Sequence, residues 1–334
     1  EPAPKSRFAS RMVLARKAIP GEPKDSIVFK VRPCVDMTSV NTQIHKLPPN
    51  YNDAHEEMKK LAGNEFFWIA DGKSQFHSIL LDESSREATT VWTPLGLYRH
   101  KRMIMGERNA SVVAQQAYRE CLATMPDDVQ KRTACFQDDM AGGTRTVMQC
   151  AKDFVVFLEM CDQEAITLTP PKVHLFYDHC EFYGFRVDHT GYTYQQKNLD
   201  PILKMQLPDS LPALRRVMGL MCQLKNYVKD YKILAKPLGK VQSEKAWKEG
   251  NPIKKEQIDA FNLLKGQLSK GVHLHAHDKT KPLYLGTDAS AAGAGACLYQ
   301  LSDELGEDGK PHKEIICWWS QAFTPAQAKY PAYW

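Results

Sequence analysis

The stretch Cys135-Phe136-Gln137-Asp138-Asp139-Met140 places two consecutive carboxylates after an apolar run and ahead of the pair Gly142-Gly143. The pattern predicts a strand, a tight turn that carries Asp138 and Asp139, and a returning strand. At roughly 4 Å and an effective dielectric constant near 20, two such carboxylates repel each other by about 4 kcal/mol. Two interpretations are open: a solvated turn that points both groups into water, or a divalent-metal site that needs a third oxygen ligand from elsewhere in the chain.

A third carboxylate stands in a matching context. Residues 66–70 form the aromatic-rich run Phe-Phe-Trp-Ile-Ala, which predicts a buried strand that ends at Asp71. Taken alone, Asp71 is an ordinary cap at the end of a strand. Beside the turn of Asp138 and Asp139 it would be the missing metal ligand.

Length and composition favour a protein with several domains that works inside a cell. At 334 residues the chain is longer than one hydrophobic core usually serves, so we expect two or three domains. No apolar run approaches the roughly 18 residues of a membrane span, and no secretory signal opens the chain. The 9 cysteines include no Cys-x-x-Cys pair, which favours reduced thiols over a zinc module or a disulfide scaffold. The net charge of +5 suits contact with a polyanion but is common among other enzymes.

Two apolar runs near the start of the chain predict two strands joined by a loop rich in Pro and Gly. They cover residues 12–15 and 27–35, and the cations Lys17 and Arg32 lie on or beside them. These cations are either solvated charges on a hairpin or part of a phosphate site. Because the chain begins at Glu1 rather than Met, we expect it to be a piece of a longer protein.

Periodicity predicts the remaining elements. In the first half we expect helices over residues 53–61, 111–125 and 147–160, a continuing apolar segment over 76–80, and a strand pair within 89–98. In the second half we expect strands over 182–187, 192–194, 283–287 (ending at Asp288), 293–300 and 315–319, helices over 210–224 and 253–270, a polar loop over 302–312, and a helix start at 324–327. The first half therefore predicts an α+β sandwich, with helices packed on one face of a small antiparallel sheet. Since the last helix barely begins before Trp334, we expect the final domain to be cut short.

Together these pieces resemble the reverse transcriptase of gypsy-type LTR retrotransposons and, more loosely, of retroviruses and pararetroviruses. The resemblance runs from about Arg11 to the last residue. Each segment alone is a weak signal, but they occur in the family's order: Val31 to Asp36 with Asn41, Ala70 to His77, Phe136 to Asp139, Leu168 to Lys172, Phe182 to Gly184, Leu214 to Leu220, and Thr287 to Ser290 with Gly293 and Gly295.

The resemblance implies an α+β right-hand polymerase with fingers, palm and thumb, followed by a connection segment and a partial RNase H-like α/β domain. The implied boundaries are fingers 1–70, palm and fingers 71–110, palm with the Asp-Asp hairpin and primer grip 111–195, thumb 196–245, connection 246–281, and the first part of the RNase H-like domain 282–334.

The same resemblance implies an RNA- and DNA-directed DNA polymerase, part of a retroelement Pol polyprotein, that extends a primer by two-metal nucleotidyl transfer. Asp71, Asp138 and Asp139 would hold two Mg²⁺ ions, or Mn²⁺ in their place, about 3.5–4 Å apart. The implied partners are a template-primer duplex of RNA or DNA and deoxynucleoside triphosphates, with a homodimer or larger complex open and no membrane. The implied location is intracellular, in a cytoplasmic virus-like particle or the nucleus.

Further residues take roles from the resemblance. Phe76 matches an aromatic gate against the ribose 2′ hydroxyl, and Met105 stands where an aromatic residue usually lies beside the nucleotide. The implied nucleotide contacts are Lys17, Arg32, Phe76, Met105 and Lys172; the primer grip is Phe182, Tyr183 and Gly184; and the duplex contacts are Arg215, Lys225 and Lys229.

Three departures from the family pattern keep alternatives open. Met37 and Thr38 replace the usual aromatic residue and Arg, and Met105 replaces an aromatic residue. Of the RNase H metal ligands only Asp288 is matched, because the expected Glu falls at Trp334, so we do not expect this segment to cleave RNA. The alternatives are a decayed or domesticated reverse transcriptase that serves as a nucleic-acid-binding or structural subunit and, less favoured, a nuclease carried by the C-terminal segment.

Overall fold

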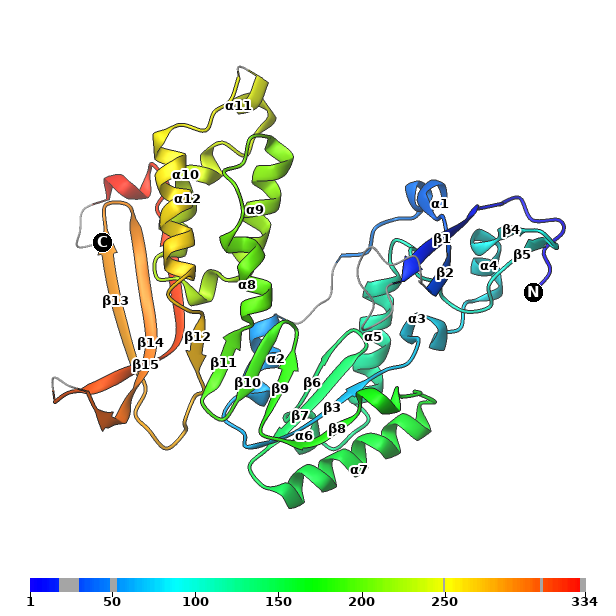
Figure 1. The fold of residues 1–334 in the computed structure, drawn as a ribbon, viewed down its shortest axis with the longest axis horizontal. Helices are drawn as coiled ribbons and strands as arrows, with labels where there is room; N and C mark the ends of the chain where they lie inside the picture. Colours follow the sequence, from blue (N-terminus) through cyan, green and yellow to red (C-terminus); the bar gives the residue numbers. More distant parts are fainter. Residues whose placement is uncertain (18–29, 49–52, 249, 307–308, 331–334) are drawn as a thin grey trace. The chain divides into compact units, whose positions relative to one another are not determined.

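The computed structural model describes residues 1–17, 30–48, 53–248, 250–306 and 309–330. The chain divides into two compact units. Figure 1 shows the fold as a ribbon whose colours follow the residue number. The first unit comprises Glu1–Lys60 and Phe67–Phe176, and the second comprises Leu61–Phe66 and Tyr177–Trp334. Each unit is described by itself.

The first unit is built around a sheet in the strand order β6-β7-β3-β8. Its strands are β6 (Thr133–Phe136), β7 (Asp139–Thr144), β3 (Phe66–Asp71) and β8 (His174–Tyr177). Helix α5 (Ala110–Leu122) packs on β6, helix α7 (Val147–Gln163) packs on β7, and the two helices contact each other (Figure 1). The predicted strand at 66–70 and the helices at 111–125 and 147–160 are confirmed within a few residues.

Aromatic packing fixes the centre of this sheet. The Trp68 ring of β3 lies 4.5 Å from the Phe157 ring and 5.6 Å from the Phe154 ring, both on α7. Gly142 of β7 lies so close that a Cβ added there would stand 2.2 Å from Nε1 of Trp68. Only glycine therefore lets β7 and Trp68 approach this closely.

The rest of the first unit consists of short elements. Strand β1 (Met12–Lys17) pairs antiparallel with β2 (Lys30–Val35), as predicted, while residues 27–29 of the expected second strand lie outside the described residues. The other elements are α1 (Thr38–Gln43), α2 (Ala54–Leu61), α3 (Gln75–Ser78), α4 (Glu83–Arg86), η1 (Glu87–Thr89), β4 (Val91–Thr93), β5 (Gly96–Tyr98), α6 (Asp127–Gln130) and η2 (Pro170–Lys172).

The second unit contains two sheets and a group of helices (Figure 1). One sheet has the order β12-β11-β10-β9, and the other has the order β13-β14-β15. The strands are β9 (His179–Phe182), β10 (Phe185–Asp188), β11 (Gly191–Tyr194), β12 (His273–His275), β13 (Tyr284–Ser290), β14 (Gly293–Leu305) and β15 (Pro311–Ala322). The helices are α8 (Gln196–Leu203), α9 (Leu211–Gln223), η3 (Lys225–Tyr227), α10 (Tyr231–Lys240), α11 (Glu244–Lys248), α12 (Lys255–Leu268) and η4 (Gln327–Lys329).

Some local elements differ from the sequence interpretation. The apolar segment at 76–80, for which no element type was predicted, begins with the helical turn α3. The expected strand over 182–187 is broken by a turn at Tyr183 and Gly184, both of which have positive φ (51° and 82°). The sequence interpretation also missed α10, whose Pro237 lies inside the helix, where proline is normally a breaker.

The C-terminal strands are longer than expected. Residues 302–305 and 311–312 of the predicted polar loop belong to β14 and β15, which continue to pair past a register shift between Leu301 and Leu305. Asp288 lies inside β13 rather than at its end, because the ladder with β14 continues to the pair of Ser290 and Gly293. At the predicted helix start over 324–327 the structure has the 3₁₀ turn η4, and the Thr324 N–H donates to Oε1 of Gln327 at 3.0 Å while its Oγ1 accepts from the Gln327 N–H at 3.3 Å.

Candidate active site

The turn between β6 and β7 carries Asp138 and Asp139 and is held by helix α5. Phe136 pairs with Asp139, so Gln137 and Asp138 form the turn, and Gln137 adopts a left-handed φ of 53°. The side chain of Gln115 clamps this turn: its Oε1 accepts from the Gln137 N–H at 2.6 Å, and its Nε2 donates to the Cys135 carbonyl at 3.3 Å. A buried polar group bonded at both ends fixes the direction of the backbone.

The end of strand β3 meets this turn directly. The N–H of Gly72 donates to the Asp138 carbonyl at 2.7 Å, and the carbonyl of Asp71 accepts from the Thr169 N–H at 2.9 Å. Three segments that are distant in the sequence therefore converge on Asp71. Gly72 is needed here, because a Cβ at this position would stand 2.7 Å from the Tyr118 hydroxyl.

The three aspartates act on one another electrostatically. Although Asp139 is partly open to solvent, desolvation of its carboxyl raises its pKa to about 6, and the charges of Asp138 and Asp71 push it in the same direction. Lys172 opposes this shift in the pKa of Asp139. A carboxyl group whose ionisation is opposed by desolvation and by two neighbouring carboxylates is typical of a cation-binding site.

Lys172 supplies part of that charge. Its ammonium pairs with Oδ1 of Asp71, a residue only 8% exposed, and this hydrogen bond is the main reason why the pKa of Lys172 is raised. In the arrangement shown, no three His, Cys, Asp or Glu side chains within the described residues form a group that could hold a metal ion. Asp71 is instead engaged by Lys172. The donor set nevertheless suits a hard cation, because it offers three carboxylates and only one ammonium.

The remaining predicted residues of the first unit are placed as follows. Phe76 lies half-buried on α3 and packs against the apolar cluster of Met103, Ala110 and Ala114. Met105 is 39% exposed, and it precedes Gly106, whose φ is +93°. Arg32 is exposed on β2, and in the part of the chain that the structure describes no ion pair joins it to the three aspartates. The side chain of Lys17 lies outside the described residues.

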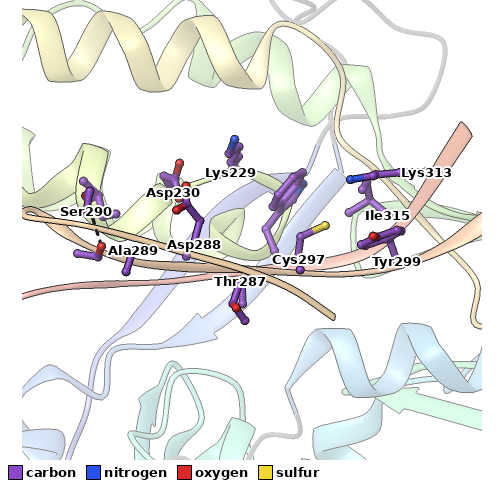
Figure 2. Close-up of a pocket in the computed structure, with 16 residues that line it drawn as sticks. Lys229, Asp230, Thr287, Asp288, Ala289, Ser290, Cys297, Tyr299, Lys313 and Ile315 are labelled. Carbon is purple, nitrogen blue, oxygen red and sulfur yellow. Dashed lines mark hydrogen bonds between the residues drawn. The ribbon is translucent and has the colours of Figure 1, made fainter. Parts of the chain in front are cut away.

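Residues of the second unit do not form a comparable acidic site within the ranges that the structure describes. Phe182 is buried, while Tyr183 and Gly184 form the β9–β10 turn, whose Gly184 carbonyl accepts from the Gln195 N–H at 3.1 Å. Arg215 on α9 and Lys225 on η3 are exposed. Lys229 and Asp288 line a pocket beside β13 and β14, together with Asp230 and Lys313 (Figure 2).

Sequence reasoning missed Gln115 and Tyr118 as supports of the site. Both lie on α5, where Gln115 is 1% exposed and Tyr118 is 2% exposed. Burial raises the pKa of Tyr118 to about 12, so its hydroxyl stays neutral beside Gly72. A signal was present, because Gln115 is a polar residue on the side of the helix that also carries Ala114, Tyr118 and Leu122.

Two family models match the chain. Residues 23–187 match the model described as "Reverse transcriptase (RNA-dependent DNA polymerase)", and residues 253–334 match an "RNase H-like domain found in reverse transcriptase". The Pol polyprotein of transposon opus from Drosophila melanogaster is 26% identical over 300 residues, which are 87% of this chain and 29% of that protein. The Pol polyprotein of transposon gypsy from the same organism is 28% identical over 252 residues, 73% of this chain and 24% of that protein. The chain thus spans less than a third of these relatives.

Solved structures show the same fold. A foamy viral protease-reverse transcriptase in complex with double-stranded DNA aligns with a TM-score of 0.75 at 19% identity, covering 98% of this chain and 54% of that one. A second structure, with an RNA/DNA hybrid, aligns with a TM-score of 0.69 at 19% identity, covering 98% and 41%. These likenesses confirm the predicted right-hand polymerase fold with an RNase H-like segment. The chain belongs to the reverse transcriptase family, with a reverse transcriptase domain followed by an RNase H-like domain.

Proposed function

We propose that this chain catalyses DNA synthesis on an RNA or DNA template by extending a primer with deoxynucleoside triphosphates. The observation that carries the proposal is the acidic cluster at β3 and the β6–β7 turn, where desolvation and two neighbouring carboxylates raise the pKa of Asp139 to about 6. Support also comes from the position of this cluster inside the segment that matches the reverse transcriptase model.

Asp71, Asp138 and Asp139 are the residues that would hold divalent cations, with Mg²⁺ as the expected ion and Mn²⁺ as an alternative. When bound, such ions supply the positive charge that activates a primer 3′ hydroxyl and stabilises a triphosphate. The chain's own part is to hold the three carboxyl groups at one place. Asp139 loses its proton above about pH 6, and Gln115 fixes the turn that carries it.

Lys172 has a second role in this proposal. Its ammonium pairs with Asp71, and it would be available to contact a triphosphate if another cation neutralised Asp71. The exposed cations Arg215 and Lys225 are proposed to contact phosphates of the template-primer duplex, without reading its sequence. Phe76, which packs against the cluster of Met103, Ala110 and Ala114, is proposed to limit the space beside the incoming sugar.

The test is primer extension on a poly(rA)/oligo(dT) duplex and on a DNA template, with Mg²⁺ present. We expect product from the wild-type chain and none from Asp138→Asn, because the variant loses a carboxylate without losing volume. Duplex binding, measured separately by fluorescence anisotropy, should be unchanged in the variant. Wild-type protein that binds duplex but makes no product would favour the non-catalytic subunit instead.

A further inference from the structure

Helix α7 presents apolar side chains on two opposite faces. The inner face packs in the core of the first unit, where Phe154, Phe157 and Met160 are buried. The outer face carries Met148, Val155 and Leu158, which are 67%, 52% and 41% exposed. A helix on the surface of a soluble unit normally turns polar residues outward, so the exposed stripe on α7 needs an explanation.

The outer residues repeat in the pattern of a helix–helix seam. Met148, Ala151, Val155 and Leu158 are spaced by three, four and three residues, which is the heptad spacing of a coiled-coil stripe. Lys152 and Glu159 lie along one flank of this stripe, seven residues apart, and both are exposed. Neither forms an ion pair within the part of the chain that the structure describes. Acidic and basic groups are balanced on this face, which disfavours a polyanion as its partner.

We propose that the outer face of α7 pairs in antiparallel orientation with α7 of a second copy of this chain, about a two-fold axis. In this register Met148 lies opposite Leu158 of the second copy, and Ala151 lies opposite its Val155. All four apolar residues are then covered in both copies. An isologous contact of this kind closes on itself as a dimer.

The charges on the flank fit the antiparallel register. Lys152 and Glu159 of the second copy are offset by about 7.5 Å along the helix axis. Their side chains lean toward their own N-termini and hence toward each other, which lets two symmetric Lys–Glu pairs form. Arg145, just before the helix, and Asp162, near its end, are also brought to the same end of the pair. A parallel pairing would leave Lys152 and Glu159 without opposite charges, because the other flank of the stripe carries the apolar residues Val147, Phe154 and Cys161.

The size of the contact sets its strength. α7 has 17 residues, so one helix face covers less than the roughly 800 Å² per partner of a standard interface. We therefore expect a weak dimer, whose population rises with protein concentration.

A charge-swap series tests the pairing. Sedimentation velocity of the whole chain over a roughly hundredfold concentration range should show wild-type protein shifting from monomer to dimer. Lys152→Glu or Glu159→Lys should weaken association about tenfold, because each change creates two like-charge contacts in the dimer. The double variant K152E/E159K should restore association, and it also controls for folding. Wild-type protein that stays monomeric, or single variants that associate like wild type, would overturn the proposal.

Thiol crosslinking tests the register. A mixture of Met148→Cys and Leu158→Cys proteins should give a crosslinked dimer with a short bifunctional thiol reagent, well above the wild-type background. Each variant alone should crosslink no more than wild type, since Met148 of one copy lies about 15 Å from Met148 of the other along the axis. Crosslinking of the single variants at the level of the mixture would contradict the antiparallel register.

Discussion

Asp71 of the first unit and Asp288 of the second unit have similar sequence contexts but different structural surroundings. Each follows an apolar run and precedes a small residue, Gly72 and Ala289 respectively. Asp71 is 8% exposed at the end of β3, and its carbonyl and that of Asp138 accept hydrogen bonds that join β3, the β6–β7 turn and the segment at Thr169. Asp288 is exposed within β13. The comparison shows that contacts with segments distant in the sequence, rather than the local motif, place a carboxylate in a cluster with other acidic residues.

Asp71 and Asp288 also differ in the number and sign of the charges that surround them. Asp71 and Asp138 lie close enough to Asp139 to raise its pKa, and Asp71 also pairs with the ammonium of Lys172. Asp288 shares its pocket with Asp230, but two lysines, Lys229 and Lys313, line the same space (Figure 2). In neither region do three His, Cys, Asp or Glu side chains of the described residues form a group that could hold a metal ion, so the contrast lies in the balance of charge. The first region carries unbalanced negative charge, whereas acidic and basic groups balance in the second.

Matched substitutions give the largest expected contrast. We expect Asp71→Asn to lower the rate of primer extension by about a thousandfold or more, because removal of one preorganised charge from a reacting centre commonly costs this much. Asp288→Asn should leave the rate within about twofold of wild type. Single-turnover extension kinetics measure both. Equal losses in the two variants would remove the distinction between the two regions.

An added methyl group should lower the stability of the protein when it is placed in β7, behind the acidic cluster, but not when it is placed on α9 of the second unit. Gly142→Ala places a methyl group against buried Trp68, so we expect a loss of stability of about 1–3 kcal/mol. Gly219 on α9 is the matched control, because nothing lies within 4 Å of a Cβ added there. Gly219→Ala should be neutral or stabilising by up to about 1 kcal/mol. Differential scanning calorimetry of both variants checks the opposite signs; an unchanged transition in Gly142→Ala would show that Trp68 moves aside easily.

Sequence patterns predicted the elements that carry the acidic residues. Runs such as 66–70 and 134–136 are apolar, short and bounded by turn residues, so their strands and the Asp138-Asp139 turn followed from local rules. The strand residues 302–305 and 311–312 did not follow, because pairing between β14 and β15 holds polar residues in extended form. The pairing of Lys172 with Asp71 also had no local signal, since it depends on a hydrogen-bonded register between segments that are far apart in the sequence.

Lys172 should compete with metal ions for Asp71. Replacing it by Met removes one positive charge next to the carboxylates, so at pH 8 we expect Mg²⁺ to bind about tenfold more tightly. Lys172→Arg keeps the charge and should bind Mg²⁺ like wild type. Isothermal titration calorimetry with Mg²⁺ alone measures this without any catalysis. Weaker binding in Lys172→Met would mean that the lysine orients Asp71 instead of competing for it.

The smallest expected effect is a pH dependence of the Mg²⁺ affinity, which only the region of Asp71, Asp138 and Asp139 should show. With a pKa of about 6, Asp139 is mostly ionised at pH 7.5 and mostly protonated at pH 5.5, so Mg²⁺ affinity should fall by about fourfold between these values. Asp139→Asn should bind Mg²⁺ more weakly, and its Mg²⁺ affinity should depend less on pH.

The folding stability of the chain without added metal should change with pH in the direction opposite to the Mg²⁺ affinity. Because the unfolded chain takes up this proton only near the ordinary value of 3.8, the folded state binds it more tightly, and lowering the pH from 7 toward 5 stabilises the fold through Asp139 even as it weakens metal binding.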